Sequence, residues 1–312
     1  MKKIIYAFCL ICVSMSSVLA QWTQYSTGNS NIHSNDLLQV IVDDNDNVWM
    51  TMTDDPIFDE FRGLQKFDGT NWTWYDTSNV ANFPVPQQWS KNYVEMTYYD
   101  GKIYLVNSDF NPGIYEFDVT NETMTLHNST TPRNEFRHIL VDNNGLLYVS
   151  QLNSIQSFDG STWTEYPLAN GSNLLDMELD NSGNIWATTD ADELQVFDGS
   201  NWQVETTLPF TPMDNHQNMG IDQNDNIWVS NGSPTQQMGE MAVWNGSTFS
   251  IHNYNSTGQN FRVVEQMVLD NDGNMRMDGI ALFSYDGSVW GRFDETNSDN
   301  TIAQDRVIDI AI

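Results

Sequence analysis

The sequence predicts an all-β fold, a β-propeller of four-stranded blades, on three observations. An apolar run that ends in Asp recurs along the chain, with these Asp residues 38–57 positions apart. Most of these runs lead into a turn rich in Asp, Asn and Gly and then into a short segment with an aromatic residue, as in DNSGNIWATT at 180–189. Beyond the first twenty residues, no stretch has a convincing helical period. Short strands and turns that repeat about every forty residues are typical of propeller blades.

Each repeat contains four strand-like segments in a fixed order. The second segment follows the turn. In most repeats the third segment ends in an aromatic residue and a DG or NG turn, and the fourth starts with an aromatic residue, as in IWATT, QVFDGSN and WQVE. Runs of β-branched and aromatic residues, broken by Asn, Asp and Gly, predict antiparallel hairpins. The first segments are LLQVIVD (37–43), VEMTYYD (94–100), FRHILVD (136–142), LLDMELD (174–180), HQNMGID (216–222), VEQMVLD (264–270) and VIDIAI (307–312).

The repeats predict six complete blades over roughly 37–295 and parts of a seventh. QWTQY at 21–25 has the pattern of a fourth strand, and DRVIDIAI at 305–312 has that of a first strand. Because propellers commonly close by pairing strands from both termini, we predict a partial seventh blade with an N-terminal fourth strand and a C-terminal first strand. The alternative is that six blades close and both tails dock as extras. We expect the propeller domain, residues 21–312, to be incomplete at its C-terminus.

Residues 1–20 are predicted to be a secretory signal peptide. Two lysines precede an apolar run at 4–13 that is too short to span a membrane, and small or apolar residues lead up to a cleavage position after Ala20. The alternative is a retained anchor. Both cysteines, Cys9 and Cys12, lie in this segment, so the mature chain would contain no disulfide. We expect a periplasmic, secreted or cell-surface protein without membrane insertion after cleavage.

The chain is strongly acidic, with 42 Asp and Glu against 12 Lys and Arg and a net charge of −30. DNA, RNA and anionic membranes each require a basic surface, so they are not expected partners. The acidity permits cation binding without requiring it, and solubility in a salty or extracellular medium is the simpler explanation.

The repeated unit, an apolar strand followed by D-x-x-G-N-I-W, F-D-G and W-x-x-Y, resembles the two-component regulator propeller repeat. The likeness is closest at DNSGNIW (180–186), FDGSNW (197–202) and GLQKFDGTNWTWY (63–75), and it covers essentially all of 21–312. It departs at YYDGKIY in the second repeat and at DNDGNMRM in the sixth.

This resemblance implies an exported propeller of Bacteroidetes type. Family members often form the periplasmic sensor region of hybrid histidine kinases, where they bind glycans, and others are free exported proteins. Streptogramin-lyase and NHL-type propellers are similar at the D-x-x-G-N-I-W level, so the repeat predicts fold better than function.

One candidate ligand site lies along the predicted channel, which the first strand of each blade should line. Four residues before each aligned Asp the chain places a polar residue, with Met96 as the apolar exception. The predicted channel ring consists of Gln39, His138, Asp176, Asn218, Gln266 and Asp309. It could hold only water, bind a ligand hydroxyl, or bind a cation such as calcium through Asp176, Asp309 and His138. We expect no other cofactor.

A second candidate site lies on the face that carries the long, variable connections, because variable loops on a rigid scaffold often carry function. Its aromatic and basic residues suit a glycan or a peptide, although such aromatics also tuck into the scaffold. The predicted contacts are Phe58, Phe61, Arg62, Trp89, Arg137 and Arg262. A further set of aromatics recurs at fixed repeat positions and is predicted to form interblade core: Trp49, Trp72, Trp163, Trp186, Trp202, Trp228 and Trp290.

The sequence contains no G-x-S-x-G elbow, H-E-x-x-H motif or phosphate loop. This favours a non-enzymatic, exported ligand-binding or interaction propeller for a glycan, a protein or a peptide, with a sensor-like role as one option. Two alternatives stay open. One is a propeller enzyme, a lyase or glycan-active enzyme that uses channel residues such as His138 and a metal; the other is a structural cell-surface repeat protein.

Overall fold

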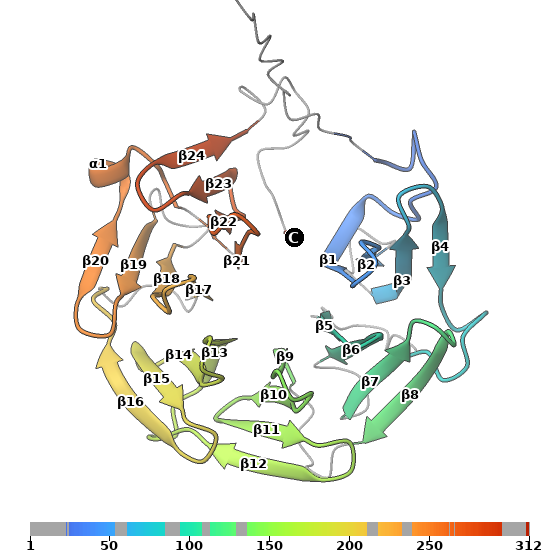
Figure 1. Ribbon diagram of the computed structural model, residues 1–312, viewed down its shortest axis with the longest axis horizontal. Helices are drawn as coiled ribbons and strands as arrows, with labels where there is room; N and C mark the ends of the chain where they lie inside the picture. Colours follow the sequence, from blue (N-terminus) through green and yellow to red (C-terminus); the bar gives the residue numbers. More distant parts are fainter. Residues whose placement is uncertain are drawn as a thin grey trace, which may run out of the picture.

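The structure is a computed structural model, and it confirms the predicted all-β propeller. The described part of the chain forms six four-stranded antiparallel sheets and one four-residue helix, α1. Figure 1 shows the sheets arranged as blades around a central axis. The residues that the structure describes are 23, 25–53, 61–84, 94–107, 113–128, 136–210, 218–232, 239–261, 263–264, 266–294 and 310–311.

The strands follow one another in chain order within each blade. Blade 1 contains β1 (Asp36–Val42), β2 (Val48–Thr53), β3 (Phe61–Phe67) and β4 (Trp72–Tyr75). Blade 2 contains β5 (Val94–Tyr99), β6 (Lys102–Asn107), β7 (Gly113–Asp118) and β8 (Thr123–Asn128). Blade 3 contains β9 (Ile139–Val141), β10 (Leu147–Gln151), β11 (Ser154–Phe158) and β12 (Trp163–Pro167).

The same order continues through the second half of the chain. Blade 4 contains β13 (Leu174–Leu179), β14 (Ile185–Thr189), β15 (Glu193–Phe197) and β16 (Trp202–Thr207). Blade 5 contains β17 (Met219–Ile221), β18 (Ile227–Asn231), β19 (Glu240–Trp244) and β20 (Phe249–His252), and is followed by α1 (Tyr254–Thr257). Blade 6 contains β21 (Met267–Leu269), β22 (Met275–Met277), β23 (Leu282–Tyr285) and β24 (Trp290–Phe293).

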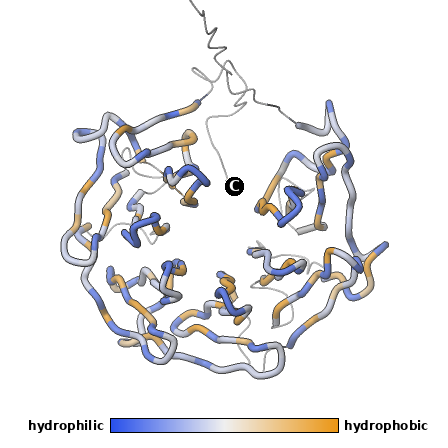
Figure 2. The backbone as a smooth tube through the Cα atoms, in the orientation of Figure 1, coloured by the Kyte–Doolittle hydropathy of each residue, from blue (hydrophilic) through white to orange (hydrophobic). Residues whose placement is uncertain are grey.

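The first strand of every blade lies nearest the axis and the fourth lies on the outside (Figure 1). For the six described blades, this confirms the prediction that the apolar runs before the aligned Asp residues form the inner strands. Figure 2 shows hydrophobic and hydrophilic residues alternating along the blades, as expected for sheets whose two faces differ in environment.

The Asp that ends each inner strand organises the turn to the second strand. Asp43 accepts hydrogen bonds from the backbone amides of Asn45 (2.9 Å) and Asn47 (3.0 Å) and from Trp49 Nε1 (2.8 Å). Burial alone would raise the pKa of Asp43, but these hydrogen bonds outweigh it and lower the pKa. The turn therefore fixes the aromatic residue of the second strand as well as its own backbone.

The same bond recurs between Asp180 and Trp186 (3.0 Å) and between Asp222 and Trp228 (3.2 Å). In the sixth repeat, where the sequence lacks the Trp, Arg276 Nε donates to Asp270 Oδ2 instead (2.8 Å).

Aromatic and apolar side chains fill the spaces between blades. Between blades 1 and 2, Trp49 stacks on Tyr75 at 5.6 Å, and Tyr75 contacts Phe117 of the next blade at 5.1 Å. The prediction that the recurrent tryptophans form interblade core is confirmed, because each of the seven packs in or against a hydrophobic cluster. Such packing fixes each blade against the next.

The predicted strands of a partial seventh blade are not shown. Of the segments 21–25 and 305–312, the structure describes only Thr23, Tyr25, Ile310 and Ala311, and none of these lies in a strand. The predicted signal peptide, residues 1–20, lies outside the described residues. Nowhere in the described ranges is there a helix with the length and apolarity of a membrane span.

Candidate functional site

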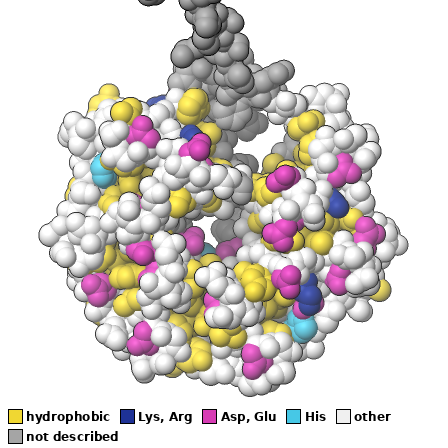
Figure 3. Space-filling model, in the orientation of Figure 1, with side chains coloured by type: hydrophobic (Ala, Val, Ile, Leu, Met, Phe, Trp, Pro, Cys, Tyr) yellow, Lys and Arg dark blue, Asp and Glu magenta, His cyan; other side chains and the backbone are white. Residues whose placement is uncertain are grey.

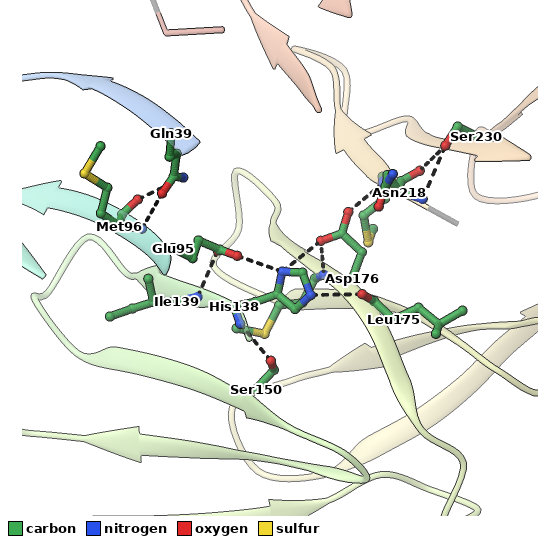
Figure 4. A network of polar contacts seen from close by, with 12 residues as sticks. Gln39, Glu95, Met96, His138, Ile139, Ser150, Leu175, Asp176, Asn218 and Ser230 are labelled. Carbon is green, nitrogen blue, oxygen red and sulfur yellow. Dashed lines mark hydrogen bonds and ion pairs between the residues drawn. The ribbon is translucent and has the colours of Figure 1, made fainter. Parts of the chain in front are cut away.

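The predicted channel ring lies where the inner strands face the axis. Gln39 and Asp176 belong to β1 and β13, while His138, Asn218 and Gln266 directly precede β9, β17 and β21. Asp309 lies outside the described residues. Figure 4 shows Gln39, Glu95, His138, Asp176 and Asn218 following one another from blade to blade.

Each described ring side chain bonds to the backbone of a segment further along the chain, at or near the next inner strand where the structure describes one. Gln39 Oε1 accepts from Met96 N (2.5 Å) and Gln39 Nε2 donates to Met96 O (3.3 Å). Asp176 Oδ2 accepts from Met219 N (2.8 Å). The corresponding bonds further round the ring join His138 Nε2 to Leu175 O (2.9 Å), Asn218 Nδ2 to Val264 O (2.8 Å), and Gln266 Oε1 to Ile310 N (2.7 Å). A belt of hydrogen bonds therefore connects neighbouring blades at the channel wall.

Blade 2 departs from the pattern in a way that the sequence did not reveal. Met96, at the ring position, is 3% exposed and contributes its backbone. The neighbouring residue, Glu95, takes over the side-chain role, and its Oε1 accepts from Ile139 N of blade 3 (3.0 Å). The inner strand of blade 2 thus places a carboxylate where the repeat alignment predicted a thioether.

A second set of polar residues, missed from the sequence, supports the belt from within blades 3, 5 and 6. The backbone amide of His138 donates to Ser150 Oγ (2.9 Å), and that of Gln266 donates to Asp278 Oδ1 (2.7 Å). These second-strand residues stand eight positions after the aligned Asp. The sequence signal is a Ser, Thr or Asp that recurs at this position, and the structure shows that all of these residues are buried: Thr51, Ser150, Thr188, Ser230 and Asp278.

The charged part of the belt is a cluster around His138, which we call the channel cluster: Glu95, His138, Asp176 and Glu178. His138 Nδ1 lies 3.0 Å from Glu95 Oε2 and 3.4 Å from Asp176 Oδ1. Side chains of these three residues are 13–26% exposed. Burial alone would lower the pKa of His138, but Glu95 and Asp176 outweigh it and raise the pKa from 6.5 to about 9. His138 is therefore an imidazolium at neutral pH.

The two carboxyl groups on β13, those of Asp176 and Glu178, have raised pKa values, which favour their neutral forms. Burial raises the pKa of Asp176 from 3.8 to about 6, although His138 works against this shift. Burial, together with the negative charges of Asp176 and Glu95, raises the pKa of Glu178 well above its usual 4.5. Three carboxyl groups thus share one cation, and Figure 3 shows acidic side chains at the wall of the central hollow.

The predicted channel cation gains no support from this geometry. Within the described ranges, no group of three or more His, Cys, Asp or Glu residues is arranged to hold a metal ion. Nδ1 of His138 faces the two carboxylates and Nε2 faces Leu175 O, so neither nitrogen offers a lone pair to a metal while these bonds persist.

The second candidate site falls mostly outside the described part of the chain. Phe58, Trp89 and Arg262 are not described, and Phe61 and Arg62 are placed only by backbone, at the start of β3. Arg137 is exposed, directly before His138. A shared ligand surface on the variable face stays a prediction.

Comparison with known proteins supports the fold without assigning a family. No family model matches the sequence, and no curated protein matches it. Among solved structures, virginiamycin B lyase from Staphylococcus aureus is 12% identical, with 83% of this chain and 84% of that chain covered at a TM-score of 0.61. YCF48 bound to D1 peptide is 12% identical, with 86% and 84% covered at 0.59.

An extracellular domain from B. thetaiotaomicron assigned to a hybrid two-component system is also similar, with 15% identity and 84% of this chain and 40% of that chain covered at a TM-score of 0.46. At these identities the likeness concerns the fold alone. The chain is a β-propeller with six described blades whose channel wall carries a hydrogen-bonded belt and one acidic cluster.

Proposed function

We propose that this chain is an exported, non-enzymatic binding propeller of the two-component regulator repeat type, and that it binds its ligand at the channel cluster. The observation that carries the proposal is the excess of carboxyl groups there: Glu95 and Asp176 both lie against the single cation of His138, and Glu178, two residues after Asp176 on β13, adds a third carboxyl group. Burial, with a smaller contribution from neighbouring carboxylates, raises the pKa values of Asp176 and Glu178, and a second positive group would favour their charged forms.

The chemistry of the cluster favours a ligand with an ammonium or guanidinium group. The amide and carbonyl groups of the belt already bond to neighbouring backbone, so the carboxylates are the groups with unused acceptor capacity. A basic side chain on a peptide supplies such a cation, and the acidity of the whole chain would attract it over a longer range. One propeller of similar fold binds a peptide, which agrees with a peptide ligand.

The state of His138 argues against the enzyme alternative. A general base must accept a proton near the working pH, whereas both ring nitrogens of His138 face acceptors and the pKa is about 9. His138 therefore acts as a fixed positive charge that orients the carboxylates. A glycan ligand on the variable face, as the repeat resemblance implies, stays a separate prediction.

The test measures binding of two probe peptides by isothermal titration calorimetry at low salt: blocked Gly-Lys-Gly and blocked Gly-Glu-Gly. We expect the Lys peptide to bind and the Glu peptide not to bind. Glu178→Gln removes one channel carboxyl group and should weaken Lys-peptide binding at least about tenfold, since losing a charge-assisted contact costs about 1.5–3 kcal/mol.

The matched control is Glu205→Gln, which makes the same charge change at an exposed position on β16. It should alter the affinity less than about twofold, as expected of a screened surface charge. Equal affinity for both peptides, or equal effects of both substitutions, would contradict the proposal. Melting curves of both variants establish that the fold is retained.

A further inference from the structure

Two carboxyl groups of the channel cluster are held in place by the fold. Glu95 Oε1 accepts from Ile139 N (3.0 Å), and Glu95 Oε2 lies 3.0 Å from His138 Nδ1. Asp176 Oδ2 accepts from Met219 N (2.8 Å), and Asp176 Oδ1 lies 3.4 Å from His138 Nδ1 (Figure 4). Each oxygen of Glu95 and Asp176 therefore has a partner within the protein.

Glu178, the third carboxyl group, lacks this support. Within the described ranges its side chain meets one hydrogen-bond donor, the backbone amide of the following residue, Leu179. The imidazolium of His138 is already paired with Glu95 and Asp176. A carboxylate at position 178 would thus be partly buried, and no other cation of the described chain pairs with it.

The repeat places an uncharged residue where Glu178 stands, two positions before the aligned Asp. The residues at this position in the other described blades are Ile41, Tyr98, Leu140, Gly220 and Val268. Ile41 and Leu140 pack against the hydrophobic clusters between neighbouring blades. Because residues two apart in a strand share a face, Glu178 lies on the same face of β13 as Asp176. Glu178 therefore puts an ionisable group, next to the channel cluster, in a position that usually holds an apolar side chain.

The surroundings of Glu178 favour its neutral form. Burial is the main cause that raises its pKa well above 4.5; the negative charges of Asp176 and Glu95 add to this effect, and His138 opposes it. The strands beside β13 add no further charge, because β14 and β17 contain no titratable residue and burial raises the pKa of Tyr148, on β10, above its usual 10. An unpaired carboxyl group that is partly removed from water takes up a proton, since its neutral form loses less on burial.

We propose that Glu178 is a neutral carboxyl group in the free protein and gives up its proton when a cation binds at the channel cluster, so that ligand binding is coupled to pH. The O–H bond of Glu178 breaks, the proton passes to the buffer, and the carboxylate pairs with the ammonium or guanidinium group of the ligand. The charge of the site is the same before and after binding, because one positive charge replaces another. This inference rests on the proposed function, since it concerns the cation bound at that same site.

The coupling gives the site a pH dependence that a fixed set of charges would not have. When one proton leaves for each ligand that binds, the binding constant rises about tenfold per pH unit below the pKa of the group that loses it. Measurements near pH 7 report mainly on Glu178. Asp176, with a pKa of about 6, is mostly ionised there, and His138, with a pKa of about 9, keeps its proton.

The test is isothermal titration calorimetry of the full-length protein with blocked Gly-Lys-Gly at pH 7, in phosphate buffer and in Tris buffer. These buffers differ strongly in their heat of ionisation, so the difference between the two binding enthalpies counts the protons released. The Lys side chain of the peptide stays charged at this pH and releases none. We expect about 0.5–1 proton per peptide, and a binding constant about three- to tenfold higher at pH 7.5 than at pH 6.5.

Glu178→Gln keeps the shape of the neutral carboxyl group but has no proton to lose. This variant should release less than about 0.2 proton per peptide, and its binding constant should be nearly flat over the same pH range. The matched control, Glu205→Gln at an exposed position on β16, should release as many protons as the unchanged protein.

A second measurement decides the matter where Glu178→Gln binds too weakly for calorimetry. The carboxyl carbon of Glu178, assigned by its absence in Glu178→Gln, is titrated by ¹³C NMR in the free protein. A midpoint above pH 7 supports the proposal, and a midpoint below pH 7 overturns it.

The outcomes separate this inference from the proposed function. Binding of the Lys peptide without proton release, or equal release from the unchanged protein and from Glu178→Gln, would overturn the coupling and leave the channel ligand standing. Absence of peptide binding would overturn both.

Discussion

The charge state of His138 predicts how the stability of the propeller depends on pH. The pKa of this imidazole is raised from 6.5 to about 9 because Glu95 and Asp176 outweigh the effect of burial. A group with a raised pKa in the folded state stabilises the fold fully below its unfolded pKa and loses that contribution as the pH rises through the folded value. The contribution of His138 should therefore be present below pH 6.5 and disappear by about pH 9.

The magnitude follows from the same two pKa values. They span about 2.5 pH units, and one proton changes the free energy of unfolding by about 1.4 kcal/mol per unit. The upper limit is thus roughly 3 kcal/mol. We predict that His138→Gln destabilises the protein more at pH 6.5 than at pH 9, by as much as this amount. The difference will be smaller to the extent that Asp176 and Glu178, released from the cation, take up protons themselves.

Urea unfolding monitored by tryptophan fluorescence, at several pH values between 6 and 9, measures the free energies of both proteins. A useful control is His252→Gln, because burial lowers the pKa of His252. The neutral form of His252 contributes stability above pH 6.5 that is lost at lower pH, so this substitution should leave the slope above pH 6.5 unchanged. An equal penalty for His138→Gln at pH 6.5 and pH 9 would refute the assignment of a charged imidazole.

Two further predictions concern the scaffold. Asp180→Ala removes the acceptor for Ser182 N (2.9 Å), Asn184 N (2.8 Å) and Trp186 Nε1 (3.0 Å). It should lower the free energy of unfolding in urea by about 2–3 kcal/mol. A loss below about 0.5 kcal/mol would show that the turn does not hold the tryptophan. Gly220→Ala would put a Cβ 2.6 Å from Met267 Cβ of the next inner strand and should lower the free energy of unfolding by about 1–3 kcal/mol. Gly28→Ala, whose added Cβ has its nearest neighbour at 3.7 Å, should change this free energy by less than about 0.5 kcal/mol. Similar losses at both positions would contradict this packing.

The sequence predicted the architecture because several features of each repeat indicate the same four-stranded blade. The aligned Asp recurs in all six described blades, and the turn residues and the second-strand aromatic recur in most of them, which is enough to place the inner strand of each blade. The structure adds the physical reason, since Asp43 and its equivalents bond to the turn backbone and to the tryptophan together. When the residues of a pattern lie close together in both the sequence and the structure, the structure they form can be predicted from the sequence.

The ring positions were also predictable, although their partners were not. Counting four residues back from the aligned Asp found Gln39, His138 and Asp176, and all three lie at the channel wall. Each of them bonds to a strand that is 37–57 residues away in the chain, and spacing within one repeat cannot reveal such a contact.

The departure in blade 2 shows most clearly what the repeat alignment could not predict. The repeat alignment pointed to Met96, but Glu95 supplies the side-chain contact to blade 3. Blade 2 has a shorter turn, YYDGKIY, so its inner strand meets the channel with a different residue. The channel cluster depends on this shift, because without it His138 would lack its nearer carboxylate.

The most direct test of the channel site is the pKa of His138 itself, followed by NMR of the imidazole with and without saturating blocked Gly-Lys-Gly. An ammonium group that binds Glu95, Asp176 and Glu178 competes with the imidazolium, so the pKa of His138 should fall from about 9 when the peptide is bound. If the peptide binds and the titration of His138 stays where it was, the ligand lies elsewhere and the channel cluster is not its site.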